Sequence, residues 1–226
     1  MTPRLGALLP VLVCVVLVVA CGASEDSRQP HALALINAAG DGSLGAVERL
    51  LRDGADVNAR DARGRTAVTA AAMSEHVRVV RALVDAGADV DLQDQDRNNP
   101  LLVCGENGNV ALLREVLRGH PDLGATNRYD GTALIPASDR GHVDMVRALL
   151  RTDVPVDHVN NLGWTALLEA VILGDGGPAH QQIVRLLLDA GADPAIGDRD
   201  GVTPLEHARS SGYTGIVAML EGAGAR

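Results

Sequence analysis

A short motif of the form Thr-(Ala/Pro)-(Leu/Val) recurs along this 226-residue chain at a nearly constant spacing. It opens at Thr66, Thr132, Thr165 and Thr203, and Asn99 opens a related Asn-Pro-Leu. The first three steps are 33 residues each, and the last step is 38. Leu33, which lies 33 residues before Thr66, continues the pattern and gives six registers. A fixed period of this length is typical of a solenoid whose units pack only against their neighbours.

Further positions recur in the same register. Five residues after each opener stands a small residue, at Ala38, Ala71, Cys104, Ala137, Ala170 and Ala208. Fourteen residues after most openers a Val-x-x-Leu-Leu or similar stripe begins, and Gly-Ala-Asp follows it at 54–56, 87–89 and 191–193. The opening Thr predicts the N-cap of a first helix, and the stripe predicts the buried face of a second helix. The Gly predicts the left-handed turn that ends the second helix.

The combined pattern resembles the ankyrin repeat, D-x-x-G-x-T-P-L-H-x-A…G-H…V-x-x-L-L-x-x-G-A-D, over residues 31–226. The resemblance implies an all-α solenoid of six helix-turn-helix units with short β-hairpin-like tips. The repeats lie near residues 31–60, 61–93, 94–126, 127–159, 160–197 and 198–226. It also implies that His76, His142 and His180, at the Gly-His position, bridge loop backbones through a ring nitrogen.

Three of the six units depart from the pattern. His120 and Asp153 stand where Gly would end the second helix, and both residue types tolerate a positive φ at some cost, so repeats 3 and 4 should have less regular loops. Arg97 replaces the Gly of a tip. In repeat 5, five extra residues fall between the two helices, in the segment 174–180, whose Gly and Pro content predicts a turn rather than a longer helix. The insertion is either a functional loop or a neutral extension.

The resemblance implies that a protein partner binds through the hairpin tips and the exposed edge of each first helix, on the concave side. The partner-binding candidates are Asp96, Glu106, Asn107, Arg128, Tyr129, Asp139, Arg140, Asn161, Leu162 and Trp164. Two of the three aromatic residues, Tyr129 and Trp164, lie on adjacent tips, and interface hot spots favour Trp, Tyr and Arg. Repeats 4 and 5 are therefore the expected binding region, unless Trp164 simply covers the neighbouring hairpin.

The N-terminus has the form of an export signal. Arg4 precedes an apolar run over residues 5–20, which is shorter than a membrane span of about 20 residues. The run ends Val-Val-Ala-Cys, which resembles a bacterial lipobox and implies that residues 1–21 form a lipoprotein signal with Cys21 as the lipidated residue. Cleavage after Ala20 by a plain signal peptidase and an uncleaved anchor are the alternatives. Each outcome places the domain outside the cytoplasm, at the cell membrane on the periplasmic side or at the cell surface.

Residues 22–30, which follow this signal, are predicted to form a flexible tether. The formal net charge of −9, with Arg as the only basic residue type, argues against nucleic acid as a partner. Cys104 lies in the small-residue register, which favours a buried core thiol over a nucleophile. We expect a monomer that binds an unidentified protein, without catalysis, cofactor or metal. An enzyme site at Asp175 and His180 of the insertion, and a passive envelope component, are the alternative hypotheses.

Overall fold

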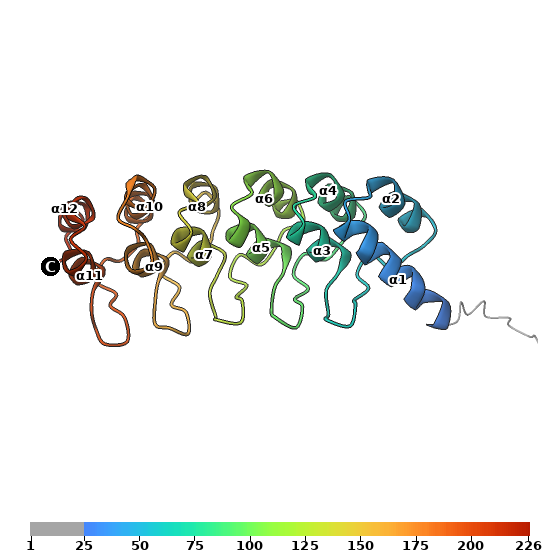
Figure 1. The fold of residues 1–226 in the computed structure, drawn as a ribbon, viewed down its shortest axis with the longest axis horizontal. Helices are drawn as coiled ribbons and strands as arrows, with labels where there is room; N and C mark the ends of the chain where they lie inside the picture. The colour runs from blue at the N-terminus through green and yellow to red at the C-terminus, as the bar shows by residue number, and fades with distance from the viewer. Residues whose placement is uncertain (1–24) are drawn as a thin grey trace, which may run out of the picture.

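The computed structural model describes residues 25–226, which form twelve α-helices and no strand. The inner helices are α1 (Glu25–Gly40), α3 (Ala67–Met73), α5 (Pro100–Asn107), α7 (Leu134–Asp139), α9 (Ala166–Ile172) and α11 (Pro204–Ser210). The outer helices are α2 (Leu44–Arg52), α4 (Val77–Asp85), α6 (Val110–Leu117), α8 (Val143–Leu149), α10 (Pro178–Asp189) and α12 (Thr214–Gly222). Figure 1 shows the two rows of helices side by side, with the hairpin tips extending beyond the inner row. The all-α solenoid predicted from the sequence is confirmed.

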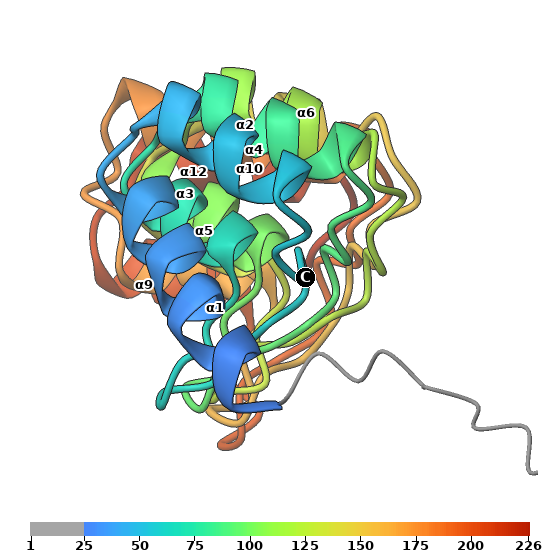
Figure 2. The same ribbon diagram turned by 90° about the vertical axis from the view of Figure 1, so that its right-hand side faces the viewer.

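The start of the solenoid differs from the expected domain boundary. Helix α1 begins at Glu25, so it includes residues 25–30, which the sequence pattern predicts as part of the tether. Viewed along the stack, α1 and α2 form the first layer, with the later units behind them (Figure 2). Residues 1–24, which contain the predicted signal and Cys21, lie outside the described residues. Within residues 25–226, no helix combines the length and the apolar character needed to cross a bilayer.

Four of the five repeat openers cap an inner helix as predicted. The side chains of Thr66, Asn99, Thr165 and Thr203 each accept a hydrogen bond from the backbone N–H three residues later, at 3.3, 2.9, 3.2 and 3.3 Å. The same prediction for Thr132 is wrong. Helix α7 begins at Leu134 after Ala133, whose backbone is already helical, and the N–H of Ile135 bonds the Thr132 carbonyl instead of its hydroxyl. The Thr132 hydroxyl is buried without a partner.

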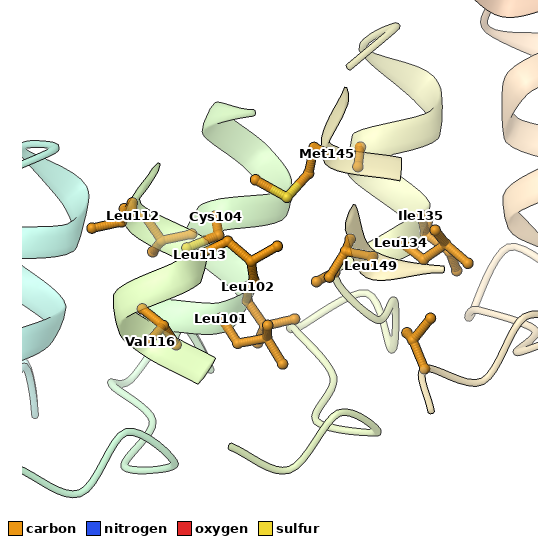
Figure 3. Packing of buried hydrophobic residues seen from close by; sticks show 14 of the residues in the cluster. Leu101, Leu102, Cys104, Leu112, Leu113, Val116, Leu134, Ile135, Met145 and Leu149 are labelled. Atoms are coloured by element: carbon orange, nitrogen blue, oxygen red, sulfur yellow. The ribbon is translucent and has the colours of Figure 1, made fainter. Parts of the chain in front are cut away.

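The core runs through the whole stack as one cluster of aliphatic side chains. The small residues that stand five positions after each repeat opener lie in or against this cluster. The apolar stripes of the outer helices also pack in it. Figure 3 shows Cys104 among Leu101, Leu113 and Met145, at the contact between repeats 3 and 4. The Cys104 side chain is fully buried, and burial raises the pKa of its thiol well above the ordinary value. A thiol that stays protonated is a poor nucleophile, which agrees with the core role predicted for it.

Among residues 25–226, four residues other than glycine have a positive φ, and each stands where other units have Gly. They are Glu75 (φ 58°), Arg97 (φ 60°), His120 (φ 53°) and Asp130 (φ 60°). His120 therefore makes the left-handed turn expected of it. Asp153 does not adopt a positive φ: helix α8 ends at Leu149 and the chain continues in tight turns, with the Thr152 hydroxyl donating to the Leu149 carbonyl at 2.6 Å, so this loop differs from those of the units with Gly.

Replacing His120 by Gly is expected to raise the free energy of unfolding by about 1 kcal/mol, because a left-handed backbone costs a side-chain-bearing residue about that much and costs Gly almost nothing. The side chain is exposed and makes no hydrogen bond or ion pair among the described residues, so its removal should lose little. Urea unfolding of the wild type and the variant measures the difference. A variant less stable than the wild type would contradict this account of the turn.

The five-residue insertion of repeat 5 divides between a turn and a helix. Helix α10 begins two residues before His180, whereas α4 begins one residue after the equivalent His76. Three inserted residues therefore lengthen α10, and the prediction that the insertion would not lengthen a helix is wrong. Pro178 at the first turn of α10 explains the extension, since its fixed φ suits a helix start and its missing N–H costs nothing there.

Candidate functional site

The hairpin tips and inner helices of repeats 2–4 enclose a cleft of about 340 Å³, here called the tip cleft. It is lined by Met73, Asp96, Asn98, Leu102, Val103, Glu106, Asn107, Asn127, Arg128, Tyr129 and Pro136. Five of the ten partner-binding candidates lie in it, namely Asp96, Glu106, Asn107, Arg128 and Tyr129. The others, Asp139, Arg140, Asn161, Leu162 and Trp164, do not line it. The cleft thus lies mainly in repeats 3 and 4, one unit earlier than the region that the sequence suggested.

Each tip of the cleft is shaped by an Asp or Asn at its base. Asp94 accepts the backbone N–H groups of Asp96 and Asn98 on one carboxylate oxygen, at 2.9 and 2.8 Å. The side-chain amide oxygen of Asn127 likewise accepts the backbone N–H groups of Tyr129 and Gly131, at 2.9 and 3.0 Å. The sequence-based prediction missed these residues, although the recurrence of an Asx residue at 61, 94, 127, 160 and 198 is visible in the sequence. Their hydrogen bonds place the neighbouring tip side chains in fixed positions.

Charged and aromatic groups meet at the mouth of the tip cleft. The Arg128 guanidinium carbon lies 4.9 Å from the centre of the Tyr129 ring, within the range of a cation–π contact. The same guanidinium lies 3.3 Å from a carboxylate oxygen of Asp96. Tyr129 is 54% exposed, and it belongs to the small group of large apolar side chains that the described surface leaves uncovered. Across the cleft, Glu106 forms an ion pair with Arg140.

The tip of repeat 5 presents a separate apolar group. Leu162 is 49% exposed, whereas Trp164 is half-buried at the base of the tip. The backbone N–H of Asn161 donates to the Tyr129 carbonyl at 2.9 Å, so the two tips are joined directly. Leu162 and Tyr129 therefore lie on neighbouring, linked tips, and a smaller fraction of the Trp164 side chain is exposed than of either of them.

The Asp175–His180 pair of the insertion forms as the sequence suggested. His180 Nδ1 lies 2.9 Å from an Asp175 carboxylate oxygen, and Nε2 lies 2.9 Å from the Asp139 carbonyl oxygen. The N–H of Gly177 and then His180 lower the pKa of Asp175. His76 and His142 make the same Nε2 contact with the carbonyl groups of Gly40 and Glu106, at 3.0 and 3.1 Å, as the resemblance implied. His180 is thus held in a bridge between units.

Glu169 of helix α9 is a buried carboxyl group without a cationic partner among the described residues. One of its oxygens accepts a hydrogen bond from the Asn160 side-chain amide at 2.8 Å. Burial, and to a lesser extent the negative charge of Asp139, raise the pKa of Glu169 to about 7, against the opposing effect of the Asn160 hydrogen bond. The side-chain oxygen of Asn160, Oδ1, in turn accepts the backbone N–H groups of Leu162 and Trp164, at 2.9 and 3.0 Å. Glu169 is therefore connected to the backbone of the repeat 5 tip.

The described residues do not bring together a metal site. No group of three His, Cys, Asp or Glu side chains between residues 25 and 226 is arranged so that it could hold a metal ion. Asp175 and His180 have no third titratable ligand beside them, and His207 is bonded to Asp198 at 2.8 Å. The features that stand out among the described residues are a cleft, an exposed ring and paired charges.

Comparison with known proteins agrees with this description. The family model of ankyrin repeats in three copies matches residues 13–94, 35–125 and 101–198. A putative ankyrin repeat protein, YahD, of Escherichia coli K12 is 52% identical over 58 residues, which cover 26% of this chain and 29% of YahD. The matched segment therefore spans less than a third of that relative.

Two solved structures cover almost the whole solenoid. An ankyrin repeat domain from Acinetobacter baumannii AYE is 47% identical, with a TM-score of 0.83 over 85% of this chain and 98% of that domain. The ankyrin repeat protein EF0377 is 38% identical, with a TM-score of 0.81 over 84% of this chain and 97% of that one. Ankyrin repeats are protein–protein interaction modules, and they generally serve as scaffolds rather than enzymes. By its helices, its repeat positions and these matches, the chain belongs to the ankyrin repeat family.

Proposed function

We propose that this chain binds a protein partner through the tip cleft, with Tyr129 and Arg128 as the central contacts. The observation that carries the proposal is the exposed Tyr129 ring, whose backbone N–H bonds Asn127 and which lies beside a guanidinium at the edge of a cleft. A rigid aromatic side chain loses little conformational freedom when it is covered, which is why such groups dominate interfaces. The cleft is walled by Leu102, Val103 and Pro136, so it would accept an apolar side chain of the partner.

The charges of the cleft define the polar part of the partner. Asp96, Glu106 and Arg128 are exposed at its rim, and each already has an oppositely charged neighbour at 3.3 Å or closer. A partner with both a basic and an acidic group beside an apolar one would satisfy this arrangement. Exposed ion pairs of this kind contribute about 0–1 kcal/mol each to the free energy of binding. They therefore contribute more to the specificity for the partner than to the affinity.

Replacing Tyr129 by Ala is expected to weaken partner binding by about tenfold or more, as truncation of a central aromatic contact does. The partner would first be identified by pull-down with the detergent-solubilised wild-type chain, and its affinity would then be measured for Tyr129→Ala, Arg128→Ala and Trp164→Ala. Arg78→Ala, at an exposed residue of α4 far from the tips, is the control. If Trp164→Ala weakened binding while Tyr129→Ala and Arg128→Ala did not, the binding site would lie in repeat 5 and the proposal would fail.

We further propose that the domain works outside the cytoplasm, attached to the cell membrane by lipid on Cys21. Support comes from residues 1–21 alone, where a single positive charge, an apolar run and Val-Val-Ala-Cys follow one another. The wild-type chain should incorporate radiolabelled palmitate in a bacterial host, and Cys21→Ala should not. Label on Cys21→Ala, or export of an unlabelled wild-type chain cut after Ala20, would show that Cys21 is not the anchor.

A further inference from the structure

The outer segments of repeats 3 and 4 have a second Arg at a position where repeats 2 and 5 have Asp. In repeats 2 and 5, an Arg on the outer helix is followed four residues later by Asp, as in Arg81–Asp85 and Arg185–Asp189. In repeats 3 and 4 the same two positions are both Arg, as Arg114–Arg118 and Arg147–Arg151. The net charge of the whole chain is −9, whereas segments 110–118 and 143–151 together contain four Arg against two carboxylates, Glu115 and Asp144, so this arginine-rich patch is locally positive.

Three of these four arginines, all except Arg147, lie around an apolar groove between α6 and α8, here called the outer groove. It has a volume of about 380 Å³ and is lined by Val110, Leu113, Leu117 and Ala148, with Arg114, Arg118 and Arg151 around them. Helices α6 and α8 have 8 and 7 residues, fewer than the other outer helices among residues 25–226. In Figure 1 these helices lie in the outer row, on the side of the solenoid away from the tips.

Two of the arginines at the outer groove have no acidic partner among the described residues. Arg118 is bonded to Asp85 at 2.6 Å and to Glu115 at 3.0 Å. Arg114 and Arg151 are exposed, and neither is within ion-pair distance of a carboxylate of residues 25–226. A guanidinium offers five hydrogen-bond donors in a plane and matches a carboxylate well. The outer groove thus combines an apolar floor with two cations that are available to bind acidic groups.

We propose that the outer groove docks an amphipathic helix of a protein partner, whose acidic side chains pair with Arg114 and Arg151. A groove between two helices accepts the ridge of side chains on a third helix. Eight residues of helix span about 12 Å, so the groove would hold about two turns of the partner, with apolar residues three or four positions apart. A flat membrane surface fits less well, because the apolar floor is recessed between helices and the chain as a whole repels an anionic bilayer. This surface is separate from the tip cleft, and the two proposals stand independently.

The test uses a fluorescent synthetic peptide about four turns long, with Leu at every third or fourth position and Glu at the flanking ones. Its anisotropy would be followed on titration with the full chain in a non-ionic detergent. We expect saturable binding, with an affinity about tenfold lower for Arg114→Glu/Arg151→Glu and an intermediate loss for Arg114→Gln/Arg151→Gln. Arg78→Glu, at an exposed arginine of α4 that is likewise unpaired among the described residues, should change the affinity less than about twofold.

The same peptide with Lys in place of Glu should bind at least about tenfold more weakly. Absence of saturable binding by the acidic peptide, or equal binding of both peptides, would overturn the proposal. It would also be overturned if the double Glu variant bound as the wild type does while circular dichroism showed it to be folded. The last measurement is co-sedimentation of the chain with phosphatidylglycerol vesicles. Sedimentation with the vesicles that depends on Arg114 and Arg151, without peptide binding, would identify a lipid surface as the ligand instead.

Discussion

Replacing Glu169 by Gln is expected to stabilise the protein by about 3 kcal/mol at pH 8 and to have almost no effect at pH 4, since each unit of pKa difference corresponds to about 1.4 kcal/mol. The cause is the burial of a carboxyl group that has only the Asn160 amide as a polar partner. A glutamine side chain at this position would keep an oxygen that can accept the same hydrogen bond, but it would never carry the charge. The variant therefore removes the cost of ionisation and little else.

The direction of this pH dependence follows from the two states of the chain. The pKa of Glu169 is about 7 in the folded protein and close to its ordinary value of 4.5 in the unfolded chain. The folded state therefore holds the proton more tightly. Below pH 4.5 both states are protonated and the wild type loses nothing, whereas stability declines as the pH rises towards and through 7, and the loss is complete above it.

Urea unfolding at pH 4, 6 and 8 measures this effect. Glu206→Gln is the matched control, because its carboxylate accepts the N–H and the hydroxyl of Thr203, which lower the pKa of Glu206. That variant should lose stability at pH 8, where Glu169→Gln gains it. Equal stabilisation by Glu169→Gln at all three pH values would mean that the charge of Glu169 is not the cause.

Replacing Gly105 by Ala is expected to lower the free energy of unfolding by about 3 kcal/mol, at the upper end of the cost of overpacking a core. Gly105 lies in α5 where it meets the next unit, and a Cβ there would overlap the backbone carbonyl group of Ala133. A backbone obstacle cannot rotate away as a side chain can. The change should therefore push apart repeats 3 and 4, on which the tip cleft depends.

The control for this variant is Gly45→Ala in helix α2, where a Cβ would have no neighbour within 4 Å. That change should stabilise the protein by about 0.5–1 kcal/mol, since Ala is the better helix former. Thermal or urea unfolding of both variants gives the comparison. If Gly105→Ala were as stable as Gly45→Ala, the two units would not be in the close contact described here.

The sequence predicts the fold well because the determinants of an ankyrin-type solenoid are local and repeated. Thr66 caps its helix through a residue three positions away, and His76 reaches a carbonyl of the adjacent unit. The predictions fail where the same residue types can adopt more than one backbone conformation. The residues around Thr132 do not indicate that α7 begins one residue later than the equivalent helix α3 does. The sequence also does not indicate that Asp153 lacks the left-handed conformation that His120 adopts.

The candidate site was predictable in part for the same reason. Register alone assigns Tyr129 and Arg128 to a tip and Glu106 to the edge of an inner helix, and the structure brings the three to one cleft. Register does not show how deeply each residue lies, so it ranks Trp164 with Tyr129 although Trp164 is the more covered of the two. Nor does it show that Leu117 and Ala148 line a groove, because this depends on where two helices end.

The Asx residues at the base of each tip and the residues at its outermost positions have different roles. Asp94 and Asn127 fix the path of the backbone through bonds to main-chain N–H groups, so the loop keeps its shape whichever side chains stand at its outermost positions. The loop therefore does not need the side chains of Asp96, Arg128 and Tyr129 to keep its shape. Mutation at these positions can change which partner is recognised while the scaffold stays intact, and a new specificity can evolve, or be selected in a library, one tip at a time.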